Sequence, residues 1–67
     1  MKPDRELLAE ALKDLHKGET VERALGRIVR RNGGTYEEYV RIMADVRELA
    51  VKEKLTSVDA TRRLAQS

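Results

Sequence analysis

The stretch Val21–Val40, VERALGRIVRRNGGTYEEYV, contains one predicted helix, a break and the start of a second helix. Its first half places apolar residues at i, i+3, i+4, i+7 and i+8, which is the spacing of one buried helix face. These residues are Val21, Ala24, Leu25, Ile28 and Val29. The break is Asn-Gly-Gly at residues 32–34, because Asn and Gly readily adopt the left-handed conformation that closes a helix. We therefore predict a helix over residues 20–32.

The second half of the stretch begins with a helix-start signal. Thr35 and Glu38 have the spacing of a capping box, in which each side chain accepts a hydrogen bond from a free amide of the first turn. Helical spacing then continues to Lys54, which predicts a helix over residues 35–54, roughly 30 Å long. Its apolar arc is wider than a half-buried helix needs. The arc consists of Tyr36, Tyr39, Val40, Ile42, Met43, Val46, Leu49, Ala50 and Val51.

Two further helices flank this stretch. On the N-terminal side, four apolar residues with helical spacing and Gly18 as a stop signal predict a helix over residues 4–17. The four are Leu8, Ala11, Leu12 and Leu15. On the C-terminal side, Thr56 or Ser57 opens a short predicted helix over residues 57–65. The pattern leaves open whether this helix is separate from the long one or continues it.

The composition fits an all-α fold class. Of the 67 residues, 39% are charged and only 3% are aromatic, a balance typical of amphipathic helices. We predict a small antiparallel three-helix bundle with a short fourth C-terminal helix, in a single domain over residues 1–67. No apolar run approaches the about 18 residues of a membrane span, so we expect no membrane contact. The absence of cysteine favours a cytoplasmic protein.

Four arginines of the helix over residues 20–32 lie opposite its apolar stripe. They are Arg23, Arg27, Arg30 and Arg31. They give residues 20–31 a net charge of +3, whereas the whole chain carries +2. One interpretation is a surface that binds phosphates or acidic groups. The other is a solvated helix face, in which the last two arginines favour the helix C-terminus and Arg23 pairs with Glu19.

No catalytic residue, metal site or cofactor site is predicted. The chain has no cysteine and only one histidine, so the common Cys/His zinc sites are excluded. His16 lacks a nucleophile to activate, because one serine lies in a predicted cap and the other at the C-terminal end. Glu37 and Glu38 belong to the first turn of a helix, where the helix dipole favours acidic residues, so they need no catalytic role. We therefore expect a protein that is not an enzyme.

The segment Glu48–Gln66 resembles the helix-turn-helix of bacterial regulators. In that family the first helix often begins Glu-Leu-Ala, and the recognition helix begins near a Ser and carries a Thr and paired basic residues. The matching positions here are Glu48, Leu49, Ala50, Ser57, Thr61, Arg62 and Arg63. The spacing is one residue too long on both sides of Ser57, and Lys54 stands where the turn usually has Gly. The resemblance implies a DNA-binding regulator.

The best-supported function from the sequence is a non-catalytic protein interaction module that forms a homodimer through the long helix. The two helices before it have narrow apolar stripes, which leave part of its arc for a twofold partner to cover. The residues expected at this interface are Tyr39, Ile42, Met43, Val46 and Leu49. A C-terminal helix folded back over the arc is the alternative cover. The rival function is nucleic-acid binding by Arg23, Arg27, Arg30, Arg31, Arg62 and Arg63.

Overall fold

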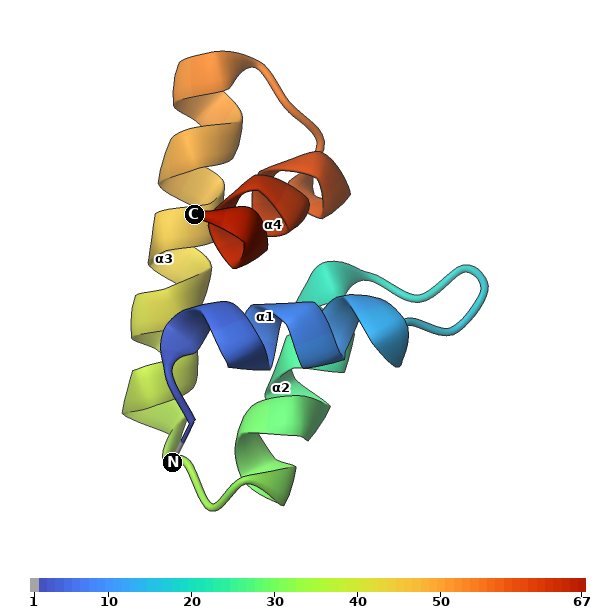
Figure 1. Ribbon diagram of the computed structural model, residues 1–67, viewed down its shortest axis with the longest axis vertical. Coiled ribbons are helices and arrows are strands. Elements are labelled where there is room, and N and C mark those ends of the chain that lie inside the picture. The colour runs from blue at the N-terminus through green and yellow to red at the C-terminus, as the bar shows by residue number, and fades with distance from the viewer. Residues whose placement is uncertain (1) are drawn as a thin grey trace.

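The computed structural model describes residues 2–67 and confirms the all-α fold class. Four helices follow one another along this part of the chain: α1 (Asp4–Lys13), α2 (Val21–Arg31), α3 (Tyr36–Glu53) and α4 (Ser57–Gln66). Figure 1 shows α3 along one side of the molecule, with α1, α2 and α4 all on the same side of it. Within the described range, no helix is both long enough and apolar enough to cross a lipid bilayer.

Three helices begin at a threonine cap. Thr20, Thr35 and Thr56 each accept a hydrogen bond from the backbone N–H three residues further on, over distances of 3.0 to 3.3 Å. The carboxylate of Glu38 accepts a bond from the N–H of Thr35 at 3.0 Å, which completes the predicted capping box. The start signals in the sequence therefore place the beginnings of α2, α3 and α4 correctly.

The C-terminal ends of α2 and α3 close with the same backbone motif. After α2, Gly33 is left-handed with φ 77°, and the N–H of Gly34 donates to the carbonyl of Val29 at 2.8 Å. After α3, Lys54 takes the left-handed conformation with φ 55°, and the equivalent bond measures 2.9 Å. This conformation usually selects glycine, because a side chain there is crowded. The turn at Lys54 makes α4 separate from α3.

The prediction for the end of the first helix is wrong by four residues. The helix stops at Lys13 instead of Lys17. In a continued helix, the N–H of His16 would bond to a carbonyl one turn back, but it donates to the Glu19 carboxylate at 3.1 Å. The N–H of Glu19 in turn donates to the carbonyl of His16 at 2.9 Å, with Gly18 left-handed between them. Gly18 is therefore a turn residue of the α1–α2 loop.

All four helices contribute to one hydrophobic core. The predicted stripe of α2 is buried at all five positions. The whole buried apolar set is Leu7, Leu8, Ala11, Val21, Ala24, Leu25, Ile28, Val29, Ile42, Met43, Val46 and Ala60. Helix α4 packs against both α1 and α3, and its Ala60 and Thr61 are fully buried. The Thr61 hydroxyl donates to the carbonyl of Ser57 at 2.7 Å, so its polar atom is satisfied inside the core.

The predicted interface on the inner arc of α3 needs correction. Ile42, Met43 and Val46 are at most 1% exposed in a single chain, so placing them at a contact with another molecule is wrong. The physical reason is that α4 folds back, and with α1 and α2 it encloses this arc in the core. Tyr39 and Leu49 are partly buried against the same core.

Candidate binding groove between α2 and α3

The arginines of α2 differ in what their guanidinium groups contact. Arg27 points to the α1–α2 loop, where its Nε donates to Oδ2 of Asp14 at 2.9 Å and its Nη1 donates to Oε2 of Glu19 at 2.6 Å. Its Nη2 donates to the backbone oxygen of Asp14 at 2.8 Å and to Oε1 of Glu19 at 3.0 Å. Arg27 therefore holds the loop together and has little capacity left for a ligand. The Glu19 carboxylate pairs with Arg27 and not, as expected, with Arg23.

The loop contacts also set the protonation of their acids. The pKa of Glu19 falls from its ordinary 4.5 to about 2, first because Arg27 donates to the carboxylate and second because the N–H of His16 does. Arg27 lowers the pKa of Asp14 by the same means. Arg31 adds a longer contact to Asp14 at 3.4 Å, from a side chain that is 57% exposed. Near neutral pH, the loop therefore carries two ionised acids neutralised chiefly by one arginine.

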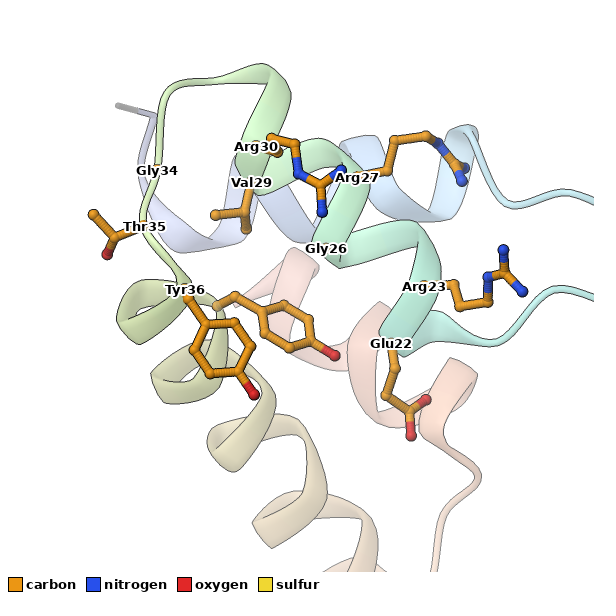
Figure 2. Close-up of a pocket in the computed structure, with 10 residues that line it drawn as sticks. Glu22, Arg23, Gly26, Arg27, Val29, Arg30, Gly34, Thr35 and Tyr36 are labelled. Carbon is orange, nitrogen blue, oxygen red and sulfur yellow. The ribbon is translucent and has the colours of Figure 1, made fainter.

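Arg23 and Arg30 have no such partners. Both are exposed, and within residues 2–67 neither guanidinium has a carboxylate within ion-pair distance. They are seven residues apart, so they lie on the same face of α2, about 10 Å apart along its axis. Gly26 lies between them, as Figure 2 shows. Two unpaired cations thus flank the one position of α2 that lacks a side chain.

This face of α2 borders a hollow of about 520 Å³ that reaches across to the start of α3. In Figure 2, Arg30 and Arg23 extend from α2 on either side of Gly26, with Arg23 directed away from Tyr36, which stands across the hollow on α3. The residues that line the hollow are Glu22, Arg23, Gly26, Arg27, Val29, Arg30, Gly34, Thr35, Tyr36 and Tyr39. We call this surface the α2–α3 groove.

Two tyrosines form the α3 side of the groove. The rings of Tyr36 and Tyr39 are 5.9 Å apart between centroids and tilted by 37°. Tyr36 is 73% exposed, whereas Tyr39 is partly buried against the core. Burial, and then the nearby charge of Glu22, raises the pKa of Tyr39, so its hydroxyl stays protonated and remains a donor. The groove therefore offers aromatic surface beside its two cations.

Packing does not explain why residue 26 is glycine. A β-carbon built at Gly26 would lie 3.7 Å from Cε1 of Tyr39, an ordinary van der Waals distance. The backbone there is helical, so alanine would fit both the conformation and the space. A glycine inside a helix costs about 1 kcal/mol relative to alanine. The helix keeps a destabilising residue at the point where the groove is flanked by free arginines.

The two arginines of α4 do not join this surface. Arg62 pairs with Asp59 at 2.8 Å and Arg63 pairs with Glu53 at 3.2 Å, and neither lines the groove. Thr61, a position of the helix-turn-helix resemblance, is fully buried and so faces away from any DNA. The six predicted binding arginines are thus distributed over the loop, the groove and α4. Of the six, the structure brings Arg23 and Arg30 together as unpaired cations.

Sequence reasoning noted both tyrosines but did not place them opposite the arginines. The sequence feature that points to this region is Gly26, a glycine on the polar side of an arginine-rich helix. Within residues 2–67, no three His, Cys, Asp or Glu side chains are grouped as a metal site would require. Comparison of the chain with models of known protein families, with curated proteins and with solved structures finds no match.

Proposed function

We propose that the protein is a non-catalytic interaction module that binds an acidic segment of another protein in the α2–α3 groove. The observation that carries the proposal is that two unpaired arginines, Arg23 and Arg30, line the same hollow as two tyrosine rings. Within residues 2–67, six of the nine arginines form ion pairs, so an unpaired arginine is the exception. The absence of cysteine supports placing this interaction in the cytoplasm.

The chemistry of the groove suits carboxylates attached to apolar surface. A guanidinium donates two parallel hydrogen bonds to one carboxylate, and these charge-assisted bonds are stronger than neutral ones. Tyrosine rings supply apolar contact area at low entropic cost, and arginine and tyrosine are the residue types that most often dominate binding energy at protein interfaces. Gly26 would allow the backbone of the bound segment to approach α2 closely.

The groove suits an acidic peptide better than a nucleic acid. Glu22 lines one part of it, and the exposed Glu37 follows Tyr36 on α3. An uninterrupted row of phosphates would meet these carboxylates as well as the arginines, which reduces the gain from neutralisation. A peptide can place a neutral or basic residue beside them. We therefore infer a protein partner, with duplex DNA as the rival that the experiment must exclude.

The test is a titration of isotope-labelled protein with a short peptide of glutamate and leucine, followed by NMR. We expect the amide signals of Gly26 and Tyr39 to shift, with an affinity that falls as salt is added. Replacing both groove arginines, Arg23→Gln with Arg30→Gln, should weaken binding by about tenfold, which corresponds to about 1.4 kcal/mol. Circular dichroism should show an unchanged fold, because both side chains are exposed.

The matched control is Arg5→Gln, since Arg5 is exposed on α1, has no ion pair within residues 2–67 and lies outside the groove. It should leave the affinity for the peptide unchanged. If Arg5→Gln weakened peptide binding equally, the effect would come from the net charge of the protein, and the groove would be rejected as the binding site. A duplex DNA titrated at low salt, binding more tightly than the peptide and through the same two arginines, would establish the rival function instead.

A further inference from the structure

The outer face of α3 carries a second apolar surface that the core does not use. Val51 is 81% exposed, Tyr36 is 73% exposed and Val40 is 45% exposed, with the exposed Ala44 between them. Arg47 interrupts the apolar stripe between Ala44 and Val51, and its guanidinium pairs with the Glu22 carboxylate of α2 at 3.7 Å. Spacings of four, eight and fifteen residues place all four side chains on one side of a helix. Figure 1 shows the other helices all on one side of α3, and the exposure of these side chains shows that the stripe is open to solvent. An exposed apolar stripe of this kind marks an interaction surface.

Four of the charged residues beside the stripe alternate in sign along the helix, while the exposed Asp45 lies further round α3 from the stripe. They are Glu37, Arg41, Glu48 and Lys52, and all four are exposed. From Glu37 to Lys52 the four charges are negative, positive, negative and positive, and from Lys52 back to Glu37 each sign is the opposite. An antiparallel second helix would therefore place Lys52 opposite Glu37 and Glu48 opposite Arg41. Both pairs are centred on the same point, between residues 44 and 45, so one twofold axis satisfies them together.

We propose that two copies of the chain associate through the outer faces of α3, antiparallel and about a twofold axis at Ala44. The small side chain of Ala44 lets the two helices approach at the axis, and Val40 and Val51 extend the apolar contact to either side. The four charged positions then form two kinds of ion pair, each present twice. A parallel arrangement in register would set like charges against each other and is disfavoured.

Arg41 already has a partner within its own chain. Its Nη1 and Nη2 donate to the two carboxylate oxygens of Asp4 at 2.7 and 3.1 Å. The side chain nevertheless remains 54% exposed, so the guanidinium is accessible to a second carboxylate. In the dimer, Arg41 would lie between Asp4 of its own chain and Glu48 of the copy. The other pair, Glu37 with Lys52, involves no intrachain ion pair within residues 2–67.

This surface meets the groove at Tyr36, which borders both, and at Glu37, which follows Tyr36, whereas Val51 and Lys52 lie near the other end of α3. The interface is one helix of 18 residues, about 27 Å long, so we expect a weak dimer with a dissociation constant in the micromolar range. Variants for the test therefore leave Tyr36 unchanged. They leave Arg23, Arg30 and Gly26 intact, so loss of dimerisation and loss of peptide binding can be told apart.

The experiment is sedimentation equilibrium of the full chain over a range of concentrations. We expect an equilibrium between the 7.7 kDa chain and a particle of twice that mass. Val51→Asp should abolish the dimer, and Glu37→Lys or Lys52→Glu alone should weaken it by about tenfold, because each sets like charges against each other across the axis. An equimolar mixture of Glu37→Lys protein with Lys52→Glu protein should restore association, because every cross-pair in the mixed dimer is again opposite in sign.

The matched control is Lys17→Glu, which makes the same change of charge at an exposed position of the α1–α2 loop. It should leave the dimer intact, and circular dichroism should show that every variant is folded. A chain that stays monomeric up to millimolar concentration would overturn the proposal. So would a dimer that survives Val51→Asp, or a mixture of the two charge variants that associates no better than either alone.

Discussion

Arg27 and Arg30 lie one turn apart on α2, yet the structure uses them in different ways. Arg27 makes four hydrogen bonds to the α1–α2 loop, while the guanidinium of Arg30 has no acidic partner within residues 2–67. The difference comes from the loop, because its turn delivers two carboxylates to one side of the helix and none to the other. A row of arginines therefore becomes a binding surface only where the rest of the fold leaves it unpaired.

The largest expected effect is a loss of stability when Arg27, the paired arginine, is replaced. Arg27→Gln removes the donors that neutralise Asp14 and Glu19, which leaves two acids close together in the loop. We expect it to lower the melting temperature more than any other single arginine substitution on α2. Arg30→Gln is the control and should change the free energy of unfolding by less than about 0.5 kcal/mol. Thermal melts followed by circular dichroism measure both, and equal losses would contradict the comparison.

Acid should weaken the same loop. The pKa of Glu19 is about 2 in the folded chain against an ordinary 4.5, so its ionised form is favoured by folding. The stability that this provides is complete above about pH 4.5 and is lost as the pH falls towards about 2. Melting curves over this range should fall less steeply for Glu19→Gln than for the unaltered chain. Parallel pH profiles would show that the loop does not depend on this carboxylate.

A substitution in the groove, unlike one in the loop, should raise the stability of the protein. Gly26→Ala removes a flexible residue from the helix, and the new methyl group fits against Tyr39, so we expect a gain of up to about 1 kcal/mol in the free energy of unfolding. The same change should weaken binding of the glutamate and leucine peptide, because the bound backbone can no longer approach α2 as closely. Urea denaturation and the NMR titration give the two readings. Greater stability with unchanged affinity would remove Gly26 from the proposed site.

The smallest effect is expected for Arg31. Its contact with Asp14 is 3.4 Å long and solvent-exposed, and exposed ion pairs contribute about 0 to 1 kcal/mol. Arg31→Gln should therefore leave both the melting temperature and the peptide affinity close to those of the unaltered chain. A marked loss of peptide affinity would mean that the binding surface extends around α2 beyond the groove.

The starts of α2, α3 and α4 were predictable because caps depend on residues within one turn of each other. Thr20, Thr35 and Thr56 satisfy backbone amides three residues away, so the relevant chemistry is contained in the local sequence. The apolar stripe of α2 was predictable for a related reason, since its period is that of the helix itself. The sequence pattern left open whether α4 is separate from α3, because the left-handed conformation of Lys54 that separates them was not predicted.

The end of α1 and the cover of α3 depended on contacts between distant segments. A helix was expected to continue past Lys13, but the chain turns there. In that turn, the N–H of His16 donates to Glu19, and Arg27, thirteen residues after Asp14, donates to the Asp14 carboxylate. Helix α4 covers the inner arc of α3 through Ala60 and Thr61, whose small side chains permit close packing. The helix has only ten residues, which is too few for its apolar spacing to predict that these two side chains are buried. The predicted interface at Ile42, Met43 and Val46 failed for this reason.

The sequence by itself determined the all-α fold class, the threonine caps of three helices and an excess of positive charge on α2, because helix periodicity and capping are local properties. The tertiary structure decided which arginine is paired, which side of α3 is covered and where the tyrosines stand relative to Gly26. Each of these depends on where a turn directs the following helix. Successive side chains of a helix are about 100° apart, so the orientation in which a turn sets the following helix decides which of its side chains face the core.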